Sequence, residues 1–379
     1  TPQTPNSPSS PPSPLITKIS AHRLKKNATL PREKLYVNEL AINEQTTIKA
    51  LNPKEPHLLV EPTSSKMPTL NPITKHKEFN GVIGSIAISI GLPILLIILY
   101  ELSNEDYHQI GLTLDFSKLY IPDFYSILTN SQVWSYYILW FFGLMVFDLI
   151  LPGVNKQGVV LRDGSRLNYK INGISLSLLL IIVLITRWWL TSGSMPELQF
   201  VYNHILELTI VSTAFSAILA NFVYLSSFIP LFKQNAQGNN ERILALGGNT
   251  GNIIYDWFIG RELNPRIGSW DIKLFCELRP GMLLWLILNL SALHHQWLKL
   301  GYVTDSLVLV NVLQAIYVFD GVLNEEGVLT MMDITTDGFG FMLSFGDLAL
   351  VPFSYSLQAR YLAVEPIHLG EIYTTIVLL

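Results

Sequence analysis

Polar side chains inside apolar segments are the residues of this sequence best placed to do chemistry. Asp347, Ser354 and Gln358 follow one another at intervals of seven and four residues in the apolar stretch 339–362, so they share one helix face. A second polar set, spread over a wider arc, lies in the stretch 306–323: Gln314, Tyr317 and Asp320. Such groups are costly in a membrane unless they face the interior of a helix bundle or a cavity. Two interpretations stay open: hydrogen bonds that hold helices together, or the lining of a polar pocket.

A polar stretch, 251–266, lies between two long apolar blocks and mixes residue types that a solvated connector does not need. It combines glycines, aromatic residues and an Asn-Pro break with four charged side chains: Asp256, Arg261, Glu262 and Arg266. We expect this stretch to fold back onto the protein.

Several other chemistries are excluded or disfavoured by residue types and spacing. The single cysteine, Cys276, allows no internal disulfide and no cysteine-rich metal or iron–sulfur site. His294 and His295 point about 100° apart on a helix, so they do not chelate one ion, and we predict no metal site. The glycine-rich run 247–251 lacks the spacing of the nucleotide-binding loops.

The elements that position these residues are membrane-spanning helices. The chain has 379 residues, of which 49% are hydrophobic and 14% charged, far below the charged share of a soluble domain. We therefore predict an all-α fold, a polytopic transmembrane helix bundle. Seven spans are expected, and an eighth begins near residue 368: 82–102, 133–151, 173–190, 204–232, 281–298, 306–323 and 339–362.

Loop charges give the bundle an orientation. The loops 152–172 and 233–279 are basic, whereas 103–132 and 191–203 are acidic or nearly neutral, which places the basic loops and the N-terminal tail on the cytosolic or nucleoplasmic side. The loop 324–337 belongs to that side, yet it carries four acids and no Lys or Arg. We expect this acidic loop to pack against protein or to serve a site.

We divide the chain into a tail, 1–78, and a transmembrane domain, 79–379. The tail begins with a Pro/Ser/Thr-rich tract that is expected to be disordered, and it carries eleven Lys or Arg against six Glu, a net charge of about +5. It is either a solvated tether or an anchor for anionic lipid or nucleic acid. The first residue is not Met and the last residues lie within an apolar run, so we expect a fragment, incomplete at its C-terminus.

Several long motifs resemble those of the membrane sterol reductases, a family that includes the Δ14-sterol reductases and the lamin B receptor. One is the mixed stretch 251–266, and another is Asp-Ile-Lys-Leu-Phe-Cys-Glu-Leu-Arg-Pro-Gly at 271–281. The other segments that carry the resemblance are 79–81, 151–173, 330–343 and 351–358. Those at 271–281, 330–343 and 351–358 resemble the Δ14-reductase and lamin B receptor branch in particular, and the resemblance covers about residues 78–379.

The resemblance implies about ten transmembrane helices and NADPH-dependent reduction of a ring double bond in a sterol substrate. This chemistry needs a general acid, a hydride donor and an apolar slot for the steroid. The candidates for the acid are Asp320, Glu325, Asp333, Asp337, Asp347 and Tyr317.

Arg261 and Arg266 have two open roles, either contacting the phosphates of NADPH or bracing their loop against Asp256 and Glu262. The C-terminal block that holds most of the family's NADPH contacts is absent from this sequence. We therefore expect the chain as written to be inactive and assign the activity to the full-length protein.

Two functions remain as rivals. The first is a Δ14-sterol reductase of the endoplasmic reticulum and nuclear envelope. The second is a lamin B receptor-like protein of the inner nuclear membrane, whose basic tail contacts chromatin or lamina with weak or no reductase activity. A transporter is disfavoured, because the sequence has no inverted repeat and no paired broken helices.

Overall fold

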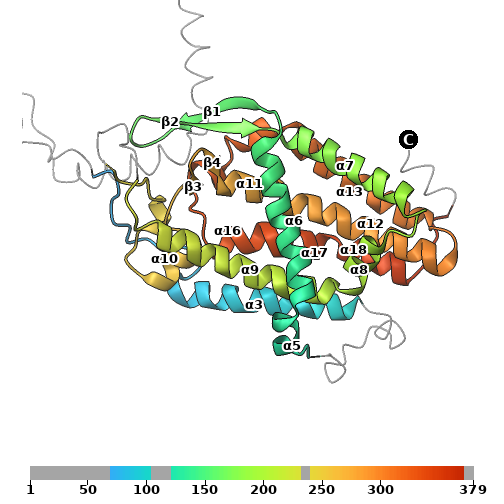
Figure 1. Ribbon diagram of the computed structural model, residues 1–379. Helices are drawn as coiled ribbons and strands as arrows, with labels where there is room; N and C mark the ends of the chain where they lie inside the picture. The colour runs from blue at the N-terminus through green and yellow to red at the C-terminus, as the bar shows by residue number, and fades with distance from the viewer. Residues whose placement is uncertain (1–68, 104–120, 232–239, 371–379) are drawn as a thin grey trace, which may run out of the picture. The chain divides into compact units, whose positions relative to one another are not determined.

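The computed structural model describes residues 69–103, 121–231 and 240–370. The predictions for the first 68 residues and for an eighth span from about 368 onward lie largely outside these ranges. Within them the chain is mostly helical, and six helices are long and apolar enough to cross a membrane. They are α3 (Gly81–Leu102), α6 (Ser131–Ile150), α7 (Gly173–Leu190), α9 (Ile205–Ser226), α11 (Ile272–Leu278) joined to α12 (Pro280–Leu300), and α13 (Asp305–Leu323). The first six predicted spans are confirmed (Figure 1), and the protein is a multi-pass membrane protein.

The seventh predicted span is helical but interrupted. It consists of α16 (Phe341–Phe345), the π-helical segment η3 (Gly346–Leu350), α17 (Val351–Tyr355) and α18 (Leu357–Val364). Pro352 has no backbone N–H to donate to the preceding turn, and a wider π turn is one way a helix accommodates such a residue. Asp347, Ser354 and Gln358 were predicted to share one face of a regular helix. They do not, because Asp347 lies in the π turn.

The purely α-helical prediction was incomplete, because the described residues also form two small hairpins. β1 (Val154–Val160) pairs antiparallel with β2 (Arg166–Ile171), and β3 (Arg266–Ile267) pairs with β4 (Trp270–Asp271). Leu167, Tyr169 and Ile171 alternate with polar residues, which is the period of a half-buried strand. Their side chains cover an apolar cluster that includes Leu274 of α11.

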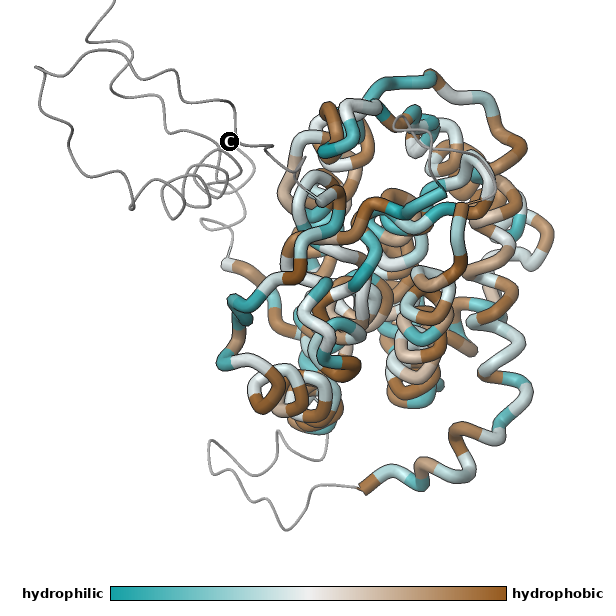
Figure 2. The backbone as a smooth tube through the Cα atoms, turned by 90° about the vertical axis from the view of Figure 1, so that its left-hand side faces the viewer, coloured by the Kyte–Doolittle hydropathy of each residue, from teal (hydrophilic) through white to brown (hydrophobic). Residues whose placement is uncertain are grey.

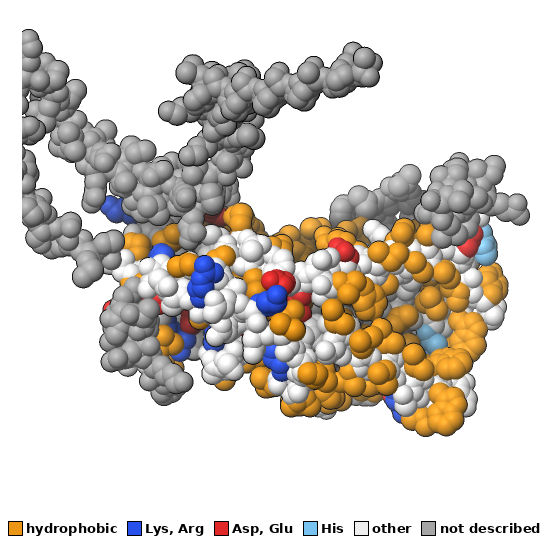
Figure 3. Space-filling model, turned by 90° about the horizontal axis from the view of Figure 1, so that it is seen from above, with side chains coloured by type: hydrophobic (Ala, Val, Ile, Leu, Met, Phe, Trp, Pro, Cys, Tyr) orange, Lys and Arg blue, Asp and Glu red, His pale blue; other side chains and the backbone are white. Residues whose placement is uncertain are grey.

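Short elements lie at both ends of the long helices. Near the hairpins are η2 (Leu246–Gly248), α10 (Ile253–Ile259), α14 (Glu325–Val328) and α15 (Met332–Thr335), and the other two are α5 (Phe124–Thr129) and α8 (Pro196–Asn203). The two loops predicted to share the cytosolic face do meet, since Nη1 of Arg266 donates to the Asn168 carbonyl (2.9 Å). In Figure 2, which views the hairpin end, hydrophilic stretches lie in these connections. Lys and Arg gather toward the same end in Figure 3.

The segment before α3 packs onto the 240–262 loop. Asn71 accepts a hydrogen bond from the Leu244 amide (2.9 Å), and the Glu78 amide donates to the Tyr255 hydroxyl (2.7 Å). These contacts hold the entry to the first span against the mixed stretch 251–266. The expectation that this stretch folds back onto the protein is confirmed.

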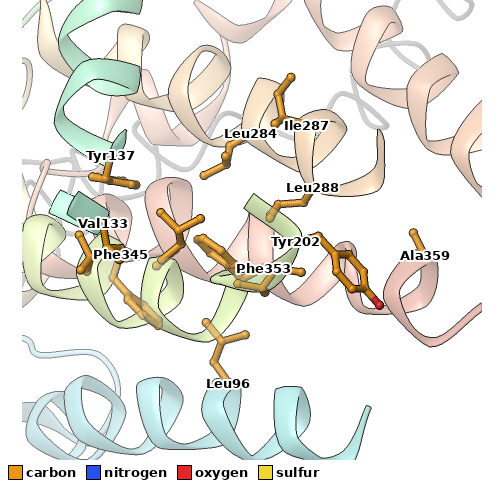
Figure 4. Close-up of a cluster of buried hydrophobic side chains, with 14 of the residues drawn as sticks. Leu96, Val133, Tyr137, Tyr202, Leu284, Ile287, Leu288, Phe345, Phe353 and Ala359 are labelled. Carbon is orange, nitrogen blue, oxygen red and sulfur yellow. The ribbon is translucent and has the colours of Figure 1, made fainter. Parts of the chain in front are cut away.

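The apolar core lies around α12. In the most apolar 18-residue window of the span 272–300, 78% of the residues are buried, against 11% in that of α3. Figure 4 shows Leu284, Ile287 and Leu288 of α12 among side chains of α6, α8 and α17: Tyr137, Tyr202 and Phe353. Since α11 leads directly into α12, charged residues on α11 are carried to the edge of this core.

Glycines let two pairs of segments approach closely. A Cβ on Gly281, in the first turn of α12, would lie 1.7 Å from the Asp347 carbonyl oxygen. Gly260 has a φ of 97°, and a Cβ there would lie 2.3 Å from the carbonyl carbon of Gly338. The backbone of α12 therefore touches the π turn, and the 260 loop touches the segment before α16.

We predict that Gly281→Ala lowers the free energy of unfolding by about 1–3 kcal/mol, because the added methyl group forces α12 away from the π turn. Gly321→Ala in α13 is the control, since its Cβ would meet nothing within 4 Å, and it should change stability by less than about 1 kcal/mol. Thermal unfolding of the purified protein in detergent measures both. Equal effects of the two substitutions would contradict the close contact.

Candidate functional site

A buried arginine joins four parts of the chain at the hairpin end. Arg279, between α11 and α12, is 1% exposed. Its Nε lies 3.1 Å from Oδ1 of Asp148 in α6, and its Nη2 donates to Oδ1 of Asn172 (2.8 Å), just before α7. Nη2 also lies 2.5 Å from Oε1 of Glu325, at the start of α14. One guanidinium thus draws together the ends of the helices.

The two carboxylates of this network have further partners. Oδ2 of Asp148 accepts from the indole N–H of Trp270 (3.0 Å), and Oε2 of Glu325 accepts from the Gly173 amide (2.7 Å). Buried charges are tolerated when their remaining lone pairs find hydrogen-bond donors in this way. Glu325, one of the acid candidates, therefore lies in an ion pair that holds the fold together.

The acidic loop 324–337 packs against protein, one of the two outcomes predicted, and its partners include cationic residues. Glu325 pairs with Arg279, and Glu326 pairs with Lys156 of β1 at 2.9 Å. The buried ammonium of Lys273 donates to the carbonyl oxygens of Asp337 (2.7 Å) and Ile334 (3.4 Å). These contacts account for the departure of this loop from the positive-inside pattern.

A second group of charges surrounds Lys273. Asp347 in the π turn interacts electrostatically with Glu277, Asp333 and Lys273. Burial raises the pKa of Asp337, in the connecting loop, while its hydrogen bond from the Thr336 hydroxyl opposes that shift. The structure thus brings together three of the predicted acid candidates, Asp333, Asp337 and Asp347.

Glu277 belongs to the same group and was missed by the sequence analysis. Oε2 of Glu277 and Oδ2 of Asp347 are both shielded from solvent without a hydrogen-bond partner among the described residues. Carboxyl groups that meet away from water favour sharing a proton over both being ionised. The available signal was a lone acid one helical turn after Lys273, at the entry to an apolar span.

The other two acid candidates lie apart from this group. Tyr317 on α13 is 64% exposed, and its ring lies 5.8 Å from that of Trp285. Asp320, also on α13, is exposed and accepts a hydrogen bond from Asn324 (3.0 Å). Neither residue contacts Asp347 in any described interaction.

The two polar sets predicted in 306–323 and 339–362 are joined by one side-chain hydrogen bond, between Gln314 and Gln358. Gln314 donates to Oε1 of Gln358 (2.9 Å) and accepts from the indole of Trp285 (2.8 Å). Gln314 therefore joins neighbouring helices, which is the first of the two interpretations left open. Ser354 donates to the Leu350 carbonyl of its own helix (2.5 Å), whereas Asp347 faces the Lys273 group. The three residues Asp347, Ser354 and Gln358 therefore have separate surroundings, because the segment that carries them is interrupted.

Arg261 and Arg266 both hold loops in place, although the partners differ from those predicted. Arg266 pairs with Asp271 (2.8 Å), and its guanidinium lies 4.5 Å from the Tyr169 ring centroid. Arg261 donates to the carbonyl and hydroxyl oxygens of Ser227, at 2.9 and 3.0 Å.

The predicted partners of these arginines, Asp256 and Glu262, bind elsewhere. Asp256 accepts from the Thr250 amide (3.0 Å) and hydroxyl (2.7 Å), and Glu262 pairs with Arg242 (2.6 Å). The reason is local. Asp256 lies in α10, close to the turn that precedes this helix, and the amides of Thr250 and Gly251 in that turn donate to its carboxylate. The cofactor role of Arg261 and Arg266 stays a prediction.

An apolar crevice of about 440 Å³ opens between α6, α7, α8 and α12. Its walls include Trp140, Leu144, Leu176 and Leu284, and Arg187 and Glu197, which form an ion pair with each other, also line it. The volume is within the range of about 300–1,000 Å³ for small-molecule sites. Leu144 and Leu176 belong to the same apolar cluster as Cys276 and Leu348, the neighbours of Glu277 and Asp347.

We predict that Arg279→Gln lowers the free energy of unfolding by about 3–5 kcal/mol, because it leaves Asp148 and Glu325 buried without their counter-charge. Lys156→Gln breaks the exposed pair with Glu326 on the same face and should cost less than about 1 kcal/mol. Thermal unfolding in detergent distinguishes the two. A loss with Arg279→Gln no larger than that with Lys156→Gln would refute the role of this network.

Comparison with known proteins gives the family. Residues 73–379 match the ergosterol biosynthesis ERG4/ERG24 family. Delta(14)-sterol reductase ERG24 of Saccharomyces cerevisiae is 60% identical over 306 residues, and that of Candida albicans is 58% identical over 312; each match covers 79% of this chain and 70% of the relative. Delta(14)-sterol reductase LBR of Gallus gallus is 39% identical, over 78% of this chain and 44% of that protein. The chain belongs to the ERG4/ERG24 family of membrane sterol reductases.

Proposed function

We propose that this protein reduces the Δ14 double bond of a sterol in sterol biosynthesis, in the endoplasmic reticulum membrane. The observation that carries the proposal is the identity of 58–60% with two fungal proteins named Delta(14)-sterol reductase, over 79% of the chain. The carboxyl groups of Glu277 and Asp347, each with one shielded oxygen, and the apolar crevice are our candidates for two parts that the reaction needs.

The reaction adds a proton to one carbon of the double bond and a hydride to the other, so each turnover consumes one proton from water. NADPH, the cofactor implied by the family resemblance, supplies the hydride when bound. Phosphate contact was one of two roles left open for two arginines; Arg266 is enclosed by Asp271 and Tyr169, and Arg261 lines a cavity.

Asp347 is our candidate for the acid, with Glu277 as its proton source. Among the predicted candidates, Glu325 is held by Arg279, and Tyr317 and Asp320 lie exposed on α13. Asp347 has a shielded oxygen without a described partner, lies in a π turn and interacts electrostatically with Glu277, which has a second such oxygen. A π turn within an α-helix frequently marks a functional site.

The proton enters from the hairpin end in this proposal. Asp333 and Asp337 are half-buried in the acidic loop, and Asp333 interacts electrostatically with both Glu277 and Asp347. Lys273 supplies one positive charge to the group and holds the loop through two backbone carbonyl groups. The order of transfer is from Asp337 and Asp333 to Glu277 and then to Asp347.

The apolar crevice between α6, α7 and α12 is our candidate for the sterol slot. Its walls are almost entirely apolar, as a steroid ring system requires, and its one ion pair, Arg187–Glu197, comes from the end of α7 and the start of α8. A polar pair of this kind suits the hydroxyl group of a sterol.

The alternative role as a chromatin or lamina tether was based on the basic tail, of which residues 1–68 lie outside the described ranges. The chicken relative, at 39% identity, carries the same reductase name as the fungal proteins. No observation favours the tether over the reductase.

We predict that Asp347→Asn, in the protein expressed at full length, lowers the rate of Δ14-sterol reduction by about 10²–10⁴-fold, the usual effect of losing a general acid. Glu277→Gln should also lower the rate and alter its pH dependence, and Glu277→Asp should restore part of it. Asp320→Asn is the control and should leave the rate unchanged. The assay is conversion of a Δ14 sterol by microsomes from reductase-deficient yeast.

The outcomes separate the function from the residues that perform it. An inactive wild-type protein at good expression would sink the reductase proposal. An active wild-type protein together with fully active Asp347→Asn would preserve the function and reject the acid.

A further inference from the structure

Three arginines line a polar cavity of about 1,160 Å³ at the hairpin end, where α9 ends. Arg162 comes from the β1–β2 turn, and Arg242 and Arg261 come from the 240–262 loop. The cavity also has polar uncharged walls, provided by Thr69, Asn71, Ser227, Asn240 and Asn249. It is distinct from the Glu277–Asp347 group and from the apolar crevice.

Each arginine is anchored by the backbone of a neighbouring segment. Arg261 donates through Nη1 to the Ser227 carbonyl (2.9 Å), Arg242 donates through Nε to the Ile229 carbonyl (2.7 Å), and Arg162 donates to the Leu244 carbonyl. The described hydrogen bonds of Arg261 involve one of its three nitrogens. A guanidinium group held in place like that of Arg261 is suited to binding the oxygens of a phosphate.

The charge of the lining is positive. Three arginines face one glutamate, Glu241, among the residues that line the cavity. Glu262, which does not line the cavity, pairs with Arg242. Burial raises the pKa of Glu262, and the charge of Arg242 opposes that shift. With both glutamates ionised, the three arginines keep a net positive charge, which favours an anionic ligand.

An apolar ridge leads along α9 to this cavity. Ile218, Phe222 and Leu225, spaced four and three residues apart, occupy one face of the helix and are 57, 48 and 65% exposed. The ridge ends at Phe228 and Ile229, each 56% exposed, which form the apolar edge of the cavity. The Arg261 guanidinium lies 4.1 Å from the Phe228 ring centroid, so the ridge and the cationic site meet at this ring.

We propose that the cavity binds the phosphate headgroup of an anionic phospholipid, whose acyl chain lies along the α9 ridge. A soluble phosphate compound would satisfy the arginines equally well, but the cavity opens at the end of the membrane-spanning helix α9, beside exposed apolar side chains, which is where a lipid headgroup lies. A basic pocket at the cytosolic end of membrane helices is typical of anionic headgroup sites. This assignment gives Arg261 a lipid phosphate as its ligand and is independent of the reductase chemistry.

The test uses the purified full-length protein in detergent, incubated with equal amounts of phosphatidic acid and phosphatidylcholine. Lipid retained after gel filtration is measured by mass spectrometry. We expect the wild-type protein to retain phosphatidic acid preferentially, and the double variant Arg162→Gln/Arg261→Gln to lose that preference by roughly tenfold. Arg162→Lys/Arg261→Lys, which keeps both charges, should retain most of the preference.

Lys156→Gln is the matched control, because it removes one positive charge from the same face outside the cavity. It should leave the preference unchanged. An unaltered preference in a monodisperse Arg162→Gln/Arg261→Gln protein would overturn the proposal, as would an equal loss with Lys156→Gln. Displacement of phosphatidic acid by millimolar 2′,5′-ADP would assign the cavity to a soluble nucleotide and overturn the lipid assignment.

Discussion

The buried guanidinium of Arg279 is the constraint on which the rest of this structure depends. At 1% exposure it needs counter-charge, and Asp148 and Glu325 supply it from α6 and from the start of α14. Removing one member of such a set leaves an uncompensated charge in a low-dielectric environment, which is far more costly than losing an exposed pair. The helix ends at the hairpin side are therefore held in one arrangement.

That arrangement has consequences for chemistry. Arg279 fixes the junction of α11 and α12, and Glu277 and Lys273 lie within two turns before it on α11. The Gly281 backbone touches the Asp347 carbonyl, which holds the π turn beside the same junction. One structural ion network thus brings Glu277 and Asp347 to the edge of an apolar core, the setting in which we propose that an alkene is protonated away from water.

The long-range partners could not be predicted from the sequence, although the spans and their charge pattern could. Runs of apolar residues set the six long helices, and the acidic loop was expected to pack against protein. Gln314 and Gln358 were both placed on inward faces, and they do meet. The π turn escaped prediction because helical periodicity assumes an uninterrupted helix, and Glu277 escaped because a single acid has no pattern. Bracing of their loop was one of the two roles left open for Arg261 and Arg266, yet their partners lie just after α9 and in β4, which only the tertiary fold brings near.

The central claim is that the protein reduces a Δ14 sterol with a proton taken from water. The most direct test is to run the reaction of the full-length protein with NADPH in D₂O and to locate the label in the product by mass spectrometry and NMR. We predict one deuterium per sterol, on the less substituted carbon of the former double bond, because the acid protonates there and the hydride meets the tertiary cation. A reduced product without solvent deuterium, or no reduced product at all, would contradict the account.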